Sequence, residues 1–99
     1  MLKVTHRIES TAGHFVHTVR QDNDGTGRWE IVDGSGKVIA DSSDEQRALI
    51  EAKRQVYKLD IARLEQIRHT DARISILIDV MDEELAELTK EALAFVKTR

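Results

Sequence analysis

Two histidines, His6 and His17, have the residue type and spacing best suited to chemistry in this chain. Each lies in a segment where apolar and polar residues alternate, which is the pattern of a strand with one buried face. If these segments pair with Glu9 opposite His14, then His6 lies opposite His17 on the apolar face. Opposed side chains on one face have Cβ atoms about 5 Å apart. The sequence therefore allows two interpretations: a ligand or divalent-metal site, or two partly buried histidines satisfied by hydrogen bonds.

The remaining sequence carries no recognisable catalytic or cofactor-binding pattern. The chain has no cysteine, which excludes disulfides, thiolate zinc sites, iron–sulfur clusters and a cysteine nucleophile. No serine lies in a Gly-x-Ser-x-Gly sequence, and the glycines lack the spacing of a phosphate-binding loop. Two histidines without a third ligand also fall short of a usual zinc site. We therefore predict a non-enzymatic protein with no catalytic residue, no metal and no cofactor.

Basic residues in the second half form a candidate nucleic-acid surface. Arg47, Arg54 and Lys58 are separated by seven and four residues, so they lie near one stripe of a helix. The whole chain, however, has 15 basic and 18 acidic residues and a net charge of −3, whereas nucleic-acid-binding domains usually carry a basic surplus. Nucleic acid is therefore not the expected partner, and a dimeric nucleic-acid-binding regulator is kept as an alternative function.

The elements that must position these residues fall into two compositional halves. All five glycines lie within the first 36 residues, and the chain has no proline. Residues 1–41 predict an antiparallel β-meander of three to four strands, near residues 2–9, 14–21, 28–32 and 37–40. The stretch 28–40, with its Asp33–Gly34 turn, is similar to one found in small bacterial domains of strand–turn–strand–helix form, and the likeness covers about residues 27–56. That resemblance reflects turn chemistry and identifies no family.

Residues 42–99 predict helix. Ser42 followed three residues later by Glu45 matches a capping box, so we expect a helix over residues 43–69. Apolar spacings of three and four then continue to the C-terminus, but Asp71 interrupts them. We favour a helical hairpin that turns at Thr70–Asp71, which pairs a basic helix with an acidic one. One long helix over residues 43–97, and a strand over residues 74–80, remain as alternatives.

The sequence therefore predicts one α+β domain over residues 1–99, in which the meander packs on a long helix followed by a second helix. The second helix carries more apolar residues than one helix–helix contact needs. We expect these residues to form a homodimer or homotetramer interface, with a heterologous protein as another possible partner. The candidate interface residues are Ile74, Ile78, Met81, Leu85, Leu88 and Phe95.

These observations favour a small oligomeric interaction or adaptor protein. The alternatives are the nucleic-acid-binding regulator and a small-ligand or metal-binding protein that uses the pair His6 and His17. No apolar run approaches the ~20 residues of a membrane span, so no membrane partner is expected. The first residues lack the apolar run of a signal peptide, which predicts a cytoplasmic protein.

Overall fold

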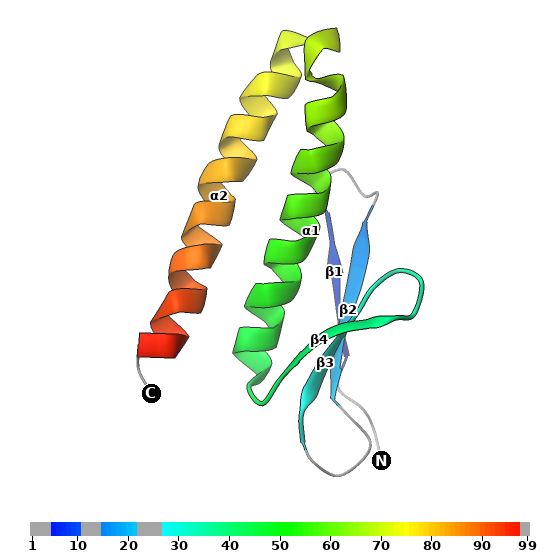
Figure 1. The fold of residues 1–99 in the computed structure, drawn as a ribbon, viewed down its shortest axis with the longest axis vertical. Helices are drawn as coiled ribbons and strands as arrows, with labels where there is room; N and C mark the ends of the chain where they lie inside the picture. Colours follow the sequence, from blue (N-terminus) through cyan, green and yellow to red (C-terminus); the bar gives the residue numbers. More distant parts are fainter. Residues whose placement is uncertain (1–4, 11–14, 22–26, 98–99) are drawn as a thin grey trace.

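The N-terminal half forms one antiparallel sheet, as the alternating pattern predicted (Figure 1). The computed structural model describes residues 5–10, 15–21 and 27–97, with side chains as far as residue 94. Its strands are β1 (Thr5–Glu9), β2 (Val16–Gln21), β3 (Trp29–Val32) and β4 (Val38–Ser42), and they lie side by side in chain order. The predicted meander is confirmed, with four strands.

The pairing of β1 with β2 differs from the predicted register by two residues. His6 lies opposite Val19 and Ile8 lies opposite His17, so the predicted pairing of His6 with His17 is wrong. An even shift leaves every side chain on the same face of the sheet, because strand side chains alternate with a period of two. The alternating pattern therefore could not separate the two registers.

Ser10 fixes the observed register at the end of this hairpin. Its backbone N–H donates to the Phe15 carbonyl at 2.8 Å, and its hydroxyl accepts from the Phe15 N–H at 3.1 Å. These bonds continue the strand pairing one residue beyond Glu9, which lies opposite Val16. The predicted partner of Glu9, His14, lies outside the described residues.

The Asp33 carboxylate organises the turn between β3 and β4. It accepts from the Ser35 N–H at 2.9 Å, the Ser35 hydroxyl at 2.6 Å and the Lys37 N–H at 3.0 Å. The hydrogen bond from the Ser35 hydroxyl, and then that from the Lys37 backbone, lowers the pKa of Asp33. Gly36 completes the turn at φ +90°, a conformation that glycine adopts without a Cβ clash. The turn predicted from the Asp–Gly pair is confirmed.

The C-terminal half forms the predicted helical hairpin. Helix α1 (Glu45–Ile67) is followed by the short 3₁₀ turn η1 (Arg68–Thr70) and by helix α2 (Ala72–Lys97). A single long helix over residues 43–97 and a strand over residues 74–80 are therefore both wrong.

Asp44, and not Ser42, caps the N-terminus of α1. The Asp44 carboxylate accepts from the Arg47 N–H at 2.9 Å, while the Ser42 hydroxyl accepts from the Asp44 N–H at 3.2 Å. The predicted capping box from Ser42 to Glu45 is therefore wrong. Aspartate and serine are comparable caps, and the chain offers both within three residues. The hydrogen bond from Asp44 decides where the helix begins.

Asp71 explains the break in the apolar spacing between the two helices. Its backbone is extended, at φ −160° and ψ 126°. Its carboxylate accepts from the Arg73 N–H at 2.9 Å, and its carbonyl accepts from the Ile74 N–H at 3.0 Å. Asp71 thus caps α2 and occupies a turn position, not a position between the helices. The pKa of Asp71 is lowered by its hydrogen bonds from the Arg73 side chain and backbone.

Helix α1 lies between the sheet and α2 (Figure 1). One apolar cluster joins α1 to the sheet and contains Val19, Trp29, Ile31, Ala48 and Ala52. A second cluster joins the two helices through Leu64, Ile78 and Met81. Among the described residues α2 packs on α1 and not on the sheet. The half of the hairpin near the turn extends beyond the sheet (Figure 1).

No helix among the described residues combines the length and the apolar character that crossing a bilayer requires.

The cap of α1 gives a first prediction. Asp44→Ala should lower the free energy of unfolding by about 1 kcal/mol, because the Arg47 N–H loses its acceptor. Urea denaturation followed by the fluorescence of Trp29, the single tryptophan, measures this change. Ser43→Ala is the matched control, because Ser43 is an exposed neighbour outside the cap. Equal losses in the two variants would contradict the assignment of Asp44 as the cap.

Candidate functional site

A recess opens on each flank of α1. The larger recess, which we call the β4–α2 groove, has a volume of about 620 Å³. It lies between the end of β4, the first half of α1 and the C-terminal half of α2. Its charged lining residues are Arg28, Arg47, Arg54, Asp41 and Glu51. Among the described residues, the groove therefore contains one more positive than negative side chain.

Two of the three arginines in the β4–α2 groove are held by carboxylates. Arg28 forms an ion pair with Asp41 at 2.9 Å. Arg54 forms an ion pair with Glu51 at 2.6 Å, and its Nε donates to the Thr89 hydroxyl of α2 at 3.3 Å. These contacts fix the Arg54 side chain across the base of the groove, between the two helices.

Arg47 differs from the other two arginines. Its backbone N–H donates to the Asp44 cap, but among the described residues no carboxylate lies within ion-pair distance of its guanidinium. Within the described part of the chain, the charge of Arg47 is therefore the one in the groove that no carboxylate neutralises.

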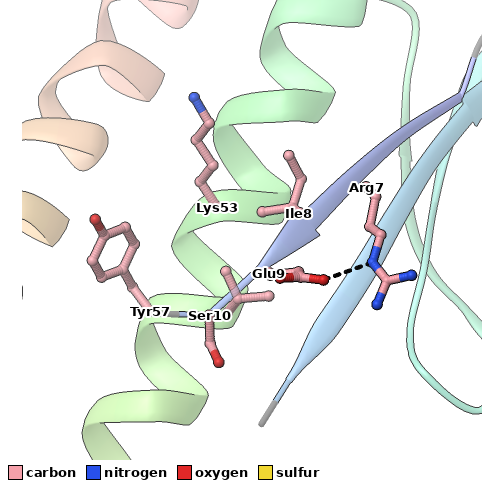
Figure 2. A pocket seen from close by; sticks show the side chains of 7 residues that line it. Arg7, Ile8, Glu9, Ser10, Lys53 and Tyr57 are labelled. Carbon is pink, nitrogen blue, oxygen red and sulfur yellow. Dashed lines mark hydrogen bonds and ion pairs between the residues drawn. The ribbon is translucent and has the colours of Figure 1, made fainter. Parts of the chain in front are cut away.

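The opposite flank of α1 carries a smaller cavity of about 290 Å³, beside β1 (Figure 2). Lys53 and Tyr57 reach it from α1, and Ser10 reaches it from the end of β1. Its two charged residues from β1, Arg7 and Glu9, form an ion pair with each other at 2.9 Å (Figure 2). Lys53 forms no ion pair with the described residues, so this cavity, like the β4–α2 groove, carries one surplus positive charge.

Tyr57 joins the two helices on this flank. Its hydroxyl donates to the Glu84 carboxylate of α2. This hydrogen bond, followed by burial, raises the pKa of Tyr57 to about 12. Sequence reasoning did not single out this pair, although both residues lie almost equally far along the chain from the turn at Thr70–Asp71. An antiparallel hairpin brings such positions together.

The structure places His6 and His17 on one face of the sheet but in different surroundings. The Nε2 atom of His6 lies 3.2 Å from a Glu45 carboxylate oxygen, and its ring lies 6.1 Å from the ring of Trp29. His17 is buried, with 4% of its surface exposed, and its Nδ1 makes no hydrogen bond to the described residues. Within that part of the chain no three histidine, cysteine or acidic side chains group as metal ligands would.

The candidate nucleic-acid residues do not share one recess. Arg47 and Arg54 line the β4–α2 groove, whereas Lys58 is exposed on α1 outside the groove lining. On the sheet, Arg20 forms an ion pair with Glu30 at 3.0 Å. The pairs at Arg7 and Arg28 repeat this arrangement, so carboxylates accompany the described arginines of the strands and the turn before β3.

The candidate interface residues lie mainly between the two helices of one chain. Ile78 and Met81 are 1% and 2% exposed and pack against α1. Ile74, Leu85 and Leu88 are half-buried, and the Phe95 side chain lies outside the described residues. Among the described side chains of α2, the exposed large apolar residues are Ile76, Leu77, Val80 and Leu93, which fall off the spacing of three and four. That departure is the sequence signal that distinguishes them.

Comparison of the chain with protein-family models, with curated proteins and with solved structures gives no match in any of the three.

The hydrogen bond between Tyr57 and Glu84 gives a second prediction. Because the pKa of Tyr57 is raised from 10.0 to about 12, this bond stabilises the fold fully below pH 10.0 and loses its effect as the pH rises to about 12. Absorbance at 295 nm should show tyrosinate forming near pH 12, since Tyr57 is the single tyrosine.

Glu84→Gln should return the pKa of Tyr57 toward 10.0, because the amide carries no negative charge. Glu87→Gln is the control, because Glu87 lies near Tyr57 without accepting from it. An unchanged midpoint in Glu84→Gln would show that burial alone raises the pKa of Tyr57.

Proposed function

We propose that this protein is a non-enzymatic interaction module that assembles as a homodimer through its helical hairpin. The observation that carries the proposal is an apolar surface on α2 that the chain does not cover. Ile76, Leu77 and Val80 are 64%, 36% and 46% exposed. At about 3.6 residues per turn, Ile76 and Val80 lie on the side of α2 away from Ile78, and Leu77 lies at the edge of the stripe in which Ile78 and Met81 pack on α1.

The position of this surface in the fold supports an intermolecular contact. Leu59 and Ile67 add two exposed apolar residues on α1, in the same half of the hairpin. That half extends beyond the sheet, so the sheet of the same chain does not cover it (Figure 1). Exposed apolar residues that gather in one region typically mark a protein contact, whereas single exposed ones are common.

The charges of the two helices favour a second copy as the partner. Helix α1 carries five basic and four acidic residues, whereas α2 carries three basic and six acidic residues. A two-fold axis beside the hairpin places α1 of one protomer next to α2 of its partner. Each acidic helix then faces a helix with a basic surplus. Both copies contribute the same apolar residues, which gives a self-complementary contact.

The proposal is tested by measuring the mass in solution with size-exclusion chromatography and light scattering. The wild-type chain should have twice its 11.3 kDa mass across a concentration range. Val80→Glu should raise the dissociation constant of the dimer at least about a hundredfold, because the contact would bury a carboxylate without a partner. Circular dichroism should show an unchanged helix content, since Val80 is exposed in the single chain.

Ala94→Glu is the matched control, because it adds the same charge at an exposed position near the other end of α2. This variant should remain dimeric. A wild-type chain that stays at 11.3 kDa at every concentration would overturn the proposal. An equal weakening of the dimer in Val80→Glu and Ala94→Glu would also overturn the proposal, because the apolar surface around Val80 would then have no special role in the contact.

A further inference from the structure

The β4–α2 groove has the charge balance of a site for one negative charge. Three arginines and two carboxylates line it, and the carboxylates hold Arg28 and Arg54. The remaining charge belongs to Arg47, whose guanidinium has no ion-pair partner among the described residues. A guanidinium presents five N–H donors in a planar fork, which matches the two oxygens of a carboxylate.

Further donors lie beside Arg47 in the same groove. The Ser43 hydroxyl is exposed and makes no hydrogen bond to the described residues. Arg54 uses its Nη1 for Glu51 and its Nε for Thr89, which leaves its Nη2 available. Arg54 is held in place by these two contacts, so it offers a positioned donor. A bound anion would thus meet donors from the start of α1 and from its middle.

The groove also contains an apolar wall that a simple inorganic ion would not use. Ala40 from β4 and Ala92 and Leu93 from α2 contribute to its lining. Leu93 is exposed in the single chain. The volume of about 620 Å³ lies within the range of sites for small organic ligands. Arginine donors beside an apolar wall suit a ligand that has both a charged end and an apolar body.

We propose that the β4–α2 groove binds a small organic monocarboxylate, with its carboxylate at Arg47 and its apolar body against Leu93. A single surplus positive charge matches a monoanion better than a doubly charged phosphate ester, since a second negative charge would face Asp41 and Glu51. The site does not depend on the dimer contact, because it lies at the other end of the hairpin from Ile76 and Val80.

The probe for the test is 3-phenylpropionate, titrated into the full chain and followed by calorimetry and by amide chemical shifts. The neutral analogue 3-phenylpropan-1-ol should bind at least tenfold more weakly, because it lacks the charge that Arg47 meets. Arg47→Gln should weaken the binding of 3-phenylpropionate at least tenfold, because a charge-assisted hydrogen bond is lost. Arg47→Lys should restore part of the affinity.

Lys58→Gln is the matched control, because it removes one positive charge from the same helix outside the groove. Lys58 follows Arg47 by eleven residues along α1, which is a distance of about 16 Å. This distance exceeds the Debye length of about 8 Å at physiological salt. The affinity of the Lys58→Gln variant for 3-phenylpropionate should stay within twofold of that of the wild-type chain. Leu93→Ser should weaken the binding of 3-phenylpropionate more than that of acetate, since acetate has little apolar surface that could contact Leu93.

Three results would overturn the proposal. The first is that 3-phenylpropionate does not bind when it is added in about tenfold molar excess to millimolar protein. Dissociation constants on the order of 1 mM, those of the weakest specific complexes, would be detected under these conditions. The second is an equal loss of affinity for 3-phenylpropionate in Arg47→Gln and Lys58→Gln, which would indicate that the overall charge of the protein attracts the ligand. The third is tighter binding of phenyl phosphate than of 3-phenylpropionate, which would reject the monocarboxylate assignment.

Discussion

The burial of α1 on two sides is the constraint on which the rest of the structure depends. On one side Ala48 and Ala52 are fully buried, and their small side chains bring the helix close to the sheet. On the other side Leu64 packs against Ile78 and Met81 of α2. This layer order keeps α2 off the sheet in the described part of the chain, so the β4–α2 groove, which lies between them, is its direct geometric result.

Three aspartates set the boundaries of the elements around this helix. Asp33 holds the turn before β4, Asp44 begins α1 and Asp71 begins α2, each by accepting backbone N–H groups. A short carboxylate suits all three positions because it reaches backbone N–H groups two to four residues ahead. Side-chain hydrogen bonds thus define where these elements begin, in a chain that contains no proline.

The sequence predicted features that local patterns control. The Asp33–Gly34 turn, the four-stranded meander and the hairpin at Thr70–Asp71 follow from turn residues and from periods of 2 and 3.6. The register of β1 was missed because a shift of two residues preserves the same face. The β4–α2 groove was missed because its walls come from four elements, β3, β4, α1 and α2, and no local period reports where α2 lies relative to β4. Arg47 was noticed as a charge but not as part of a recess.

The two ends of the hairpin are held together by different kinds of contact. The apolar cluster around Leu64, Ile78 and Met81 lies toward the turn, whereas Arg54 and Thr89 meet nearer the C-terminus through a single 3.3 Å hydrogen bond. Opening of a helix end exposes less apolar surface, and so costs less free energy, than separation of a buried cluster. Amide hydrogens in the last turns of α2 should therefore exchange with solvent faster than those beside Met81. Because Thr89, Ala92 and Leu93 of α2 line the β4–α2 groove, opening of this helix end would widen the groove at a free-energy cost distinct from that of global unfolding.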